Sequence, residues 1–139
     1  MKKLTLTNYI SFDFALYGIC SQEDDFKLCW CLNKALNIDF ARIDDIVLLH
    51  PKHKNPITFS CFSFHEPETE LDYYLMSNRS DSNWLLPEQK QTDFLLKVGG
   101  ENELYDDENT LRKIKSLPQV MTAFSLNPQS IKSIENILI

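Results

Sequence analysis

Hydrophobic residues recur at every second position in several stretches of the chain, which predicts strands. Residues 12–19 alternate in this way and predict a first strand with one buried face. Three further runs, 40–49, 57–65 and 71–77, are separated by turns that contain Pro or Asn, and we expect them to form a meander. A fourth run within residues 86–98 alternates again and stops at a pair of glycines.

A helix is expected after the first strand. Ser21 offers an N-cap with the acid Asp24 three residues later, which is close to a capping box. Placing Leu28 at the centre of a helical wheel gathers apolar side chains on one face, and Asn37 is expected to end the helix in the left-handed conformation. The expected core face consists of Leu28, Leu32, Ala35 and Leu36, with Cys29 and Cys31 at its margins.

The last third of the chain predicts a second helix, a final strand and a short closing helix. Three acids at residues 106–108 precede an amphipathic run that Pro118 terminates. Residues 120–126 predict a strand, and residues 127–138 predict a short helix with Asn127 as its cap. This order of elements predicts an α+β fold, with an antiparallel sheet of about five or six strands and two or three helices packed on one face.

Composition and charge narrow the class of protein. With 139 residues and 43% hydrophobic content, residues 1–139 are expected to form one domain. The net charge of −6 and the scattered bases argue against nucleic-acid binding. No apolar run is long enough to cross a bilayer, and polar residues interrupt the N-terminal segment where a signal peptide would be apolar. We therefore expect a cytoplasmic protein without membrane contact.

Signals for a metal, a cofactor or a nucleotide are weak. The four cysteines lack a Cys-x-x-Cys spacing, which favours buried free thiols in a reducing compartment. His50 and His53 share a loop that contains a proline, where solvated histidines are the commoner state. With three glycines in the chain, no phosphate-binding loop can be drawn. We expect no cofactor, no metal site and no catalytic residue, and the balance favours a protein that is not an enzyme.

The stretch LPEQKQTDF, residues 86–94, is the most distinctive motif. Pro87 is expected to mark the entry into the fourth run, because proline donates no hydrogen bond to a sheet. Glu88 and Asp93 are expected to be solvated or to cap backbone N–H groups. A ligand pocket beside these two acids is the alternative.

This motif resembles the signature of the IPExxxVDY family, small uncharacterised proteins of Bacteroidota. The stretches FALYGICSQEDDFKLCWCLNKAL and VMTAFSLNP extend the resemblance over most of the chain. The resemblance implies no particular activity or ligand. Genes of the family often neighbour those for acyl carrier protein, a fatty-acid condensing enzyme, ribonuclease III and pyruvate kinase, which implies a housekeeping setting. For the alternative of a small-ligand carrier or an enzyme, this association implies a link to acyl-chain metabolism. Pro87, Glu88 and Asp93 stand as the family name requires, whereas Leu86, Thr92 and Phe94 replace Ile, Val and Tyr.

The back of the first expected helix carries two large rings. Phe26 and Trp30 fall about 160° and 200° from Leu28 on the wheel, so the core face cannot easily bury both. Either the chain covers them itself, for instance with the segment around Trp84, or a partner protein does. Phe26, Trp30 and Trp84 are therefore the interface candidates of a protein-interaction module, and a symmetric dimer is the simplest partner. A small-ligand carrier or an enzyme is the alternative.

Overall fold

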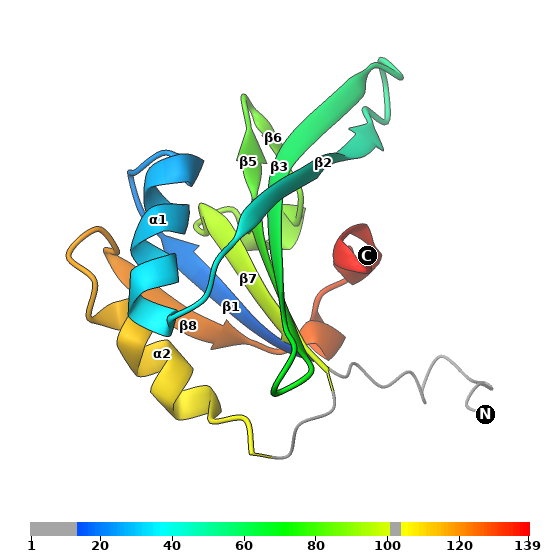
Figure 1. The fold of residues 1–139 in the computed structure, drawn as a ribbon. Coiled ribbons are helices and arrows are strands. Elements are labelled where there is room, and N and C mark those ends of the chain that lie inside the picture. The colour runs from blue at the N-terminus through cyan, green and yellow to red at the C-terminus, as the bar shows by residue number, and fades with distance from the viewer. Residues whose placement is uncertain (1–13, 101–103) are drawn as a thin grey trace.

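The computed structural model describes residues 14–100 and 104–139 (Figure 1). Six antiparallel strands form one sheet in the order β2-β3-β4-β7-β1-β8. The predicted α+β class is confirmed, and the three runs expected to form a meander are neighbours in the sheet. The strands are β1 (Phe14–Cys20), β2 (Ala41–Leu49), β3 (Pro56–Glu66), β4 (Leu71–Ser77), β7 (Phe94–Gly99) and β8 (Thr122–Leu126).

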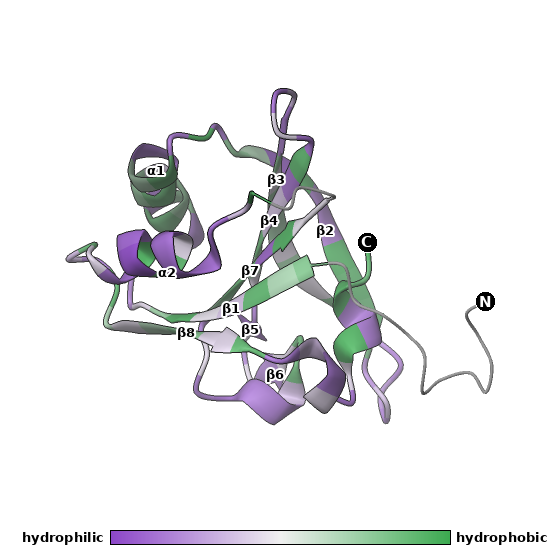
Figure 2. Ribbon diagram, turned by 90° about the horizontal axis from the view of Figure 1, so that it is seen from below, coloured by the Kyte–Doolittle hydropathy of each residue, from purple (hydrophilic) through white to green (hydrophobic). Residues whose placement is uncertain are grey.

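Two helices, α1 (Asp25–Leu36) and α2 (Asp107–Lys115), cover one face of this sheet (Figure 2). Leu28 and Leu32 of α1 are fully buried against the strands, as the wheel predicts. Asn37 ends α1 with φ of 57°, as predicted. The predicted N-cap is wrong: Asp24 caps the helix by accepting the Lys27 N–H at 2.8 Å.

Ser21 does not cap α1 because tertiary contacts hold it elsewhere. Its backbone N–H donates to Asp93 at 2.9 Å, and its hydroxyl donates to the Gln119 carbonyl at 2.7 Å. The hydroxyl also accepts the Glu23 N–H, so Ser21 joins the turn before α1 to two distant segments through its backbone N–H and its hydroxyl.

Shorter elements cover the other face of the sheet, including a hairpin made of β5 (Arg79–Ser80) and β6 (Asn83–Trp84) (Figure 2). The closing segment is not the single helix expected, although Asn127 does cap its first turn. It forms two separate turns of 3-10 helix, and Ile131 between them joins Ile134 and Ile137 of the second turn in a second core. The 3-10 elements on this face are η2 (Pro87–Gln89), η3 (Pro128–Ser130) and η4 (Ile134–Ile137).

Among the described strands, the outer strand β2 pairs with β3 alone, and together they form a long hairpin (Figure 1). A β-bulge interrupts their pairing, because Ile43 pairs with Cys61 and Ile46 with Phe59. Two residues of β2, Asp44 and Asp45, therefore oppose a single residue of β3. None of the helices in the described part of the chain is long and apolar enough to span a membrane.

Candidate functional site

The outward face of α1 carries the two aromatic side chains that the wheel places there. Phe26 is 63% exposed and Trp30 is 54% exposed, so the described part of the chain buries neither ring. They lie four residues apart and form what we call the aromatic stripe. The prediction that both rings point away from the core is confirmed, and their role in binding stays a prediction.

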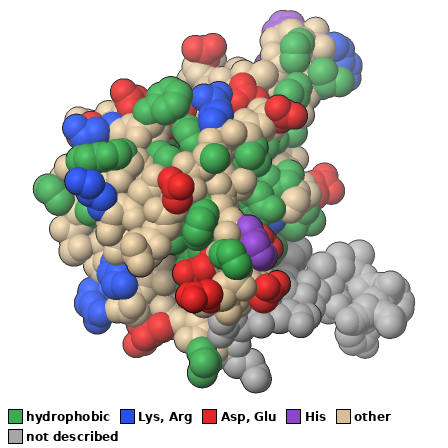
Figure 3. All heavy atoms as spheres, viewed as in Figure 1, with side chains coloured by type: hydrophobic (Ala, Val, Ile, Leu, Met, Phe, Trp, Pro, Cys, Tyr) green, Lys and Arg blue, Asp and Glu red, His purple; other side chains and the backbone are tan. Residues whose placement is uncertain are grey.

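Cations lie against both rings of the aromatic stripe. The Lys34 ammonium is 4.0 Å from the centre of the Trp30 ring, and the Arg42 guanidinium is 5.9 Å from that of Phe26. Phe26 also meets Phe62 of β3 edge to face, with ring centres 5.7 Å apart. Figure 3 shows hydrophobic side chains next to Lys and Arg side chains over α1. The stripe is therefore an apolar surface with a basic margin.

The third interface candidate, Trp84, is separate from the aromatic stripe. It is half-buried in β6 and has the Arg79 guanidinium 5.4 Å from its ring. Trp84 and Pro87 line a groove of about 450 Å³ between the β5–β6 hairpin and the outer ends of β2 and β3. The groove is also lined by Leu48, Ile57 and Phe59, with His50, Lys90 and Asn136 as polar groups.

The two acids of the LPEQKQTDF motif hold different parts of the fold. The Glu88 carboxylate accepts the hydroxyl of Ser133, which lies between η3 and η4. Asp93 accepts the Ser21 N–H at 2.9 Å and lies 2.6 Å from an Arg79 guanidinium nitrogen. Asp93 thus accepts a backbone N–H, but its donor lies 72 positions away and not in the neighbouring backbone that was expected. The two carboxylates bind separate partners and do not converge on one pocket.

Asn78 organises this motif, and sequence reasoning missed it. Its side chain is fully buried between β4 and β5. The amide nitrogen donates to the carbonyls of Gln89 and Thr92 at 2.8 and 2.9 Å, and the amide oxygen accepts the Leu86 N–H at 2.8 Å. One side chain thus fixes three backbone groups of the loop that contains Pro87 and Glu88. No local pattern signals this role.

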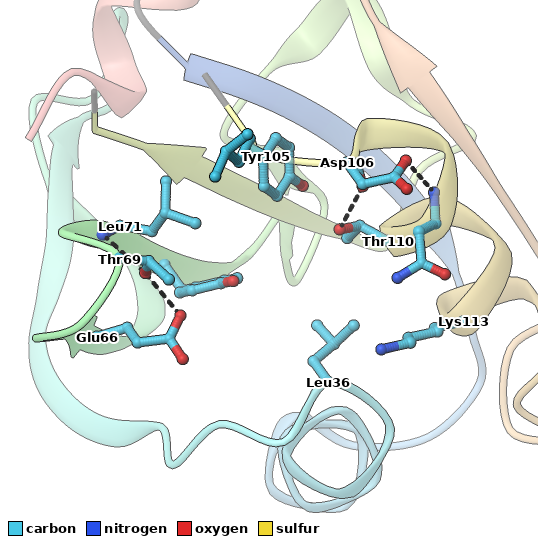
Figure 4. Close-up of a pocket in the computed structure, with 11 residues that line it drawn as sticks. Leu36, Glu66, Thr69, Leu71, Tyr105, Asp106, Thr110 and Lys113 are labelled. Carbon is cyan, nitrogen blue, oxygen red and sulfur yellow. Dashed lines mark hydrogen bonds between the residues drawn. The ribbon is translucent and has the colours of Figure 1, made fainter. Parts of the chain in front are cut away.

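A polar pocket of about 280 Å³ lies between the end of α1, the turn between β3 and β4, and the start of α2 (Figure 4). Tyr105 and Asp106 lie on one side of it, and Glu66 and Thr69 lie across from them, with Lys113 at the helix α2. Most of these polar groups already bond within the chain. Glu66 accepts the Thr69 hydroxyl at 2.7 Å, and the Asp106 carboxylate caps α2.

Three hydroxyl and carboxyl groups meet behind this pocket. The Tyr17 hydroxyl lies 2.6 Å from that of Tyr105 and also bonds the Asp107 carboxylate at the start of α2. Burial and the bond to Asp107 raise the pKa of Tyr17 far above its ordinary value, and burial also raises the pKa of Tyr105. Both hydroxyls therefore remain protonated at neutral pH and join β1 to α2.

Lys97 is a second buried polar group that the pattern of β7 does not reveal. Its side chain is 6% exposed, and its ammonium donates to the Ile137 carbonyl at 2.9 Å. The ring of Phe14 lies 4.9 Å from that ammonium. Burial lowers the pKa of Lys97. The lysine fastens η4 to the centre of the sheet, which is a structural role.

All four cysteines are free thiols, and Cys29, Cys31 and Cys61 are buried. Burial raises the pKa of Cys29 and of Cys61 to about 11, so neither is a thiolate at neutral pH. Within residues 14–100 and 104–139, no group of three His, Cys, Asp or Glu side chains could hold a metal ion. The three buried thiols pack as small apolar side chains, as expected, whereas Cys20 is half-buried and its thiol donates to the Gln91 carbonyl at 3.1 Å.

No protein-family model matches the sequence, and no curated protein matches it. The resemblance to the IPExxxVDY family therefore rests on the residues of the motif and of its flanking stretches.

Proposed function

We propose that this protein is an interaction module that binds a protein partner through the aromatic stripe of α1. The exposure of Phe26 and Trp30 carries the proposal, because two neighbouring rings on a helix are seldom left in water. Tryptophan and arginine are enriched among residues that contribute most to binding, and Trp30 and Arg42 both lie at this surface.

Burial of the aromatic stripe by a partner would release enough free energy for a specific contact. A buried Phe or Trp side chain removes about 150–250 Å² from water, at about 25 cal/mol per Å². The parts of both rings that are still exposed could therefore contribute a few kcal/mol to association. Lys34 and Arg42 keep charged groups in water beside the exposed rings. In a complex, the same charges would help to orient the partner.

Photo-crosslinking from the stripe tests the proposal. A photoreactive aromatic residue at position 26 should give adducts in the source cells, and Trp30→Ser should abolish them. The same residue at Met121 is the matched control, because Met121 is 68% exposed but lies outside α1. Equal adducts from both positions, or adducts that persist in Trp30→Ser, would contradict a specific surface.

The groove beside Trp84 supports a second candidate function, the binding of a small apolar molecule with an anionic group. Its volume of about 450 Å³ lies within the range of ligand sites, and its apolar lining is accompanied by Lys90 and His50. Pro87 at the groove connects this function with the motif. The two acids of the motif point to other partners and would not take part.

Fluorescence of Trp84 tests the second candidate. The chain has two tryptophans, so Trp30→Phe leaves Trp84 as the reporter. Titration with decanoate should shift its emission, and decanol or Lys90→Glu should weaken the response. An emission that decanoate leaves unchanged, or that decanol shifts equally, would rule out recognition of the anionic group.

A further inference from the structure

We infer that the aromatic stripe binds a second copy of this chain, with the two α1 helices antiparallel across a two-fold axis. The inference rests on the proposed function, because it names the partner of the same surface. A two-fold contact requires a surface that is complementary to itself. The stripe and the ends of α1 meet this requirement in ring spacing and in charge.

The spacing of the rings suits an antiparallel pair. With a rise of about 1.5 Å and a turn of about 100° per residue, Phe26 and Trp30 lie about 6 Å apart along the axis. They also lie about 20° to either side of the direction opposite Leu28. If the two-fold axis passes at the level of Leu28, Phe26 of each chain lies level with Trp30 of the other. The four rings then fill one layer, with Phe26 and Trp30 side by side.

The charges on α1 favour the same orientation. Three acids, Glu23, Asp24 and Asp25, lie at the N-terminal end of the helix, and Lys34 lies in its last turn. An antiparallel pair brings Lys34 of each chain to the acidic end of the other, and the two helix dipoles also oppose each other. A parallel pair would place like charges together. The surface is thus self-complementary in one orientation only.

Lys27 should destabilise the antiparallel dimer, and this gives a test of the arrangement. It is exposed on the same flank of α1 as Lys34, at about 260° from Leu28 compared with about 240°. Near the two-fold axis the two Lys27 side chains approach each other, which costs free energy. Lys27→Ala should therefore strengthen the dimer, whereas Lys34→Ala should weaken it. Against an acidic partner of another kind, both substitutions would weaken binding.

The small area of the contact between the two α1 helices indicates weak association. One pair of helices buries less than the roughly 1,200–2,000 Å² of a standard stable interface. We therefore expect a weak dimer whose population rises with protein concentration, and not an obligate one.

Sedimentation velocity over a wide range of protein concentration tests the inference. The intact chain should shift from monomer to dimer, and Trp30→Ser should remain monomeric. Glu23→Lys and Lys34→Glu should each raise the dissociation constant about tenfold, because two attractive pairs become repulsive. The double variant Glu23→Lys/Lys34→Glu should restore dimerisation to within about twofold of the intact chain. Circular dichroism of every variant checks that α1 is still folded.

Three outcomes would overturn the inference: a chain that stays monomeric, a double variant without recovery, or weaker association of Lys27→Ala. A monomeric chain whose position 26 still gives Trp30-dependent adducts with another protein would reject the dimer and keep the interaction module. A monomeric chain without such adducts would reject both.

Discussion

Asn78 shows how one buried side chain holds a loop that has little regular structure. Its amide satisfies three backbone groups between Leu86 and Thr92, and its own backbone bonds Asp93 and Leu85. Such groups are costly to leave unpaired away from water. The conformation of the LPEQKQTDF motif therefore depends on a residue eight positions before it.

Replacement of Asn78 should destabilise the protein strongly. Asn78→Ala leaves the Leu86 N–H and two carbonyls without their partner, at about 1 kcal/mol or more for each group. We expect the free energy of unfolding in urea to fall by about 3 kcal/mol. Asn55→Ala, in the exposed turn between β2 and β3, is the control and should change it by less than about 0.5 kcal/mol. Similar values for the two variants would show that the loop is held in another way.

Tyrosine ionisation should weaken the fold at alkaline pH. Burial raises the pKa of Tyr17, of Tyr105 and, to about 12, of Tyr73, from an ordinary value of 10.0. The unfolded chain releases these protons first, so their contribution to stability is complete below pH 10.0 and is lost as pH rises above it. Lys97 acts in the opposite sense because its pKa is lowered. We expect the three tyrosines to outweigh it.

The variant Tyr17→Phe separates this effect from general alkaline damage. At neutral pH it should lower the free energy of unfolding by about 1 kcal/mol through loss of the bonds to Tyr105 and Asp107. Above pH 10 its stability should fall less steeply than that of the intact chain, because one buried hydroxyl no longer ionises. Urea unfolding at several pH values measures both slopes, and equal slopes would contradict the role of Tyr17.

At the scale of elements, the outer strand β2 has an open edge that could promote aggregation and a charged bulge that opposes it. Within residues 14–100 and 104–139 it has one neighbour in the sheet, and Val47 and Leu49 are exposed on it. Such an edge can pair with other chains. The bulge at Asp44 and Asp45 places two acids at the edge, and Arg42 bonds Asp45 at 2.7 Å. Bulges and charges of this kind commonly prevent pairing between edges.

Replacement of the two acids in the bulge of β2 should promote aggregation. We expect Asp44→Thr/Asp45→Thr to aggregate faster on warming, as measured by light scattering, because the edge loses its charges and gains residues that favour strands. The control Glu68→Thr/Glu135→Thr removes two exposed acids at sites outside the strands. If both double variants aggregate equally, net charge and not the bulge protects the chain.

Elements set by local contacts were predictable from sequence, and those set by distant contacts were not. The left-handed end of α1 at Asn37 and its outward rings follow from helix geometry. The N-cap of α1 is Asp24 and not the predicted Ser21, because Ser21 bonds Asp93 and Gln119, which lie 72 and 98 positions away. The closing segment carried an overlooked signal: Ile131, Ile134 and Ile137 recur every three residues, the period of a 3-10 helix.

The candidate site likewise has one part that could be predicted from sequence and one part that could not. The exposure of the aromatic stripe could be predicted because it depends on one helix. The groove beside Trp84 could not, since it joins the β5–β6 hairpin to β2 and β3. That hairpin turns at Asp81, which has a positive φ of 54°, and its Asp-Ser turn was the one local sign of it.

For the whole molecule, one sheet separates two apolar cores. The helices cover one of them, and the β5–β6 hairpin with the closing turns covers the other (Figure 2). Strand β7 contributes to both, with Leu96 in the first core and Leu95 in the second. Because the cores share every central strand, neither is expected to persist when the other is lost.

A substitution in the second core tests this coupling. Ile137 is fully buried, and Ile137→Ala should cost about 2–4 kcal/mol, whereas Ile139→Ala at an exposed position should cost little. Single-tryptophan versions report on each side, since Trp30 lies on the helical face and Trp84 on the other. Ile137→Ala should shift both urea transitions by the same amount. A shift confined to Trp84 would mean that the two sides unfold separately.

The place of β1 in the sheet has a consequence for synthesis of the chain. β1 lies between β7 and β8 and pairs with both of them. Strand β1 therefore acquires the second of its two neighbours only after roughly a hundred further residues have been made, which takes about 5–20 s at usual rates of protein synthesis. During that interval β1 lacks the hydrogen-bonding partner that β8 provides on one side. The sheet around β1 therefore depends on contacts between residues far apart in the sequence, and contacts of this kind slow folding.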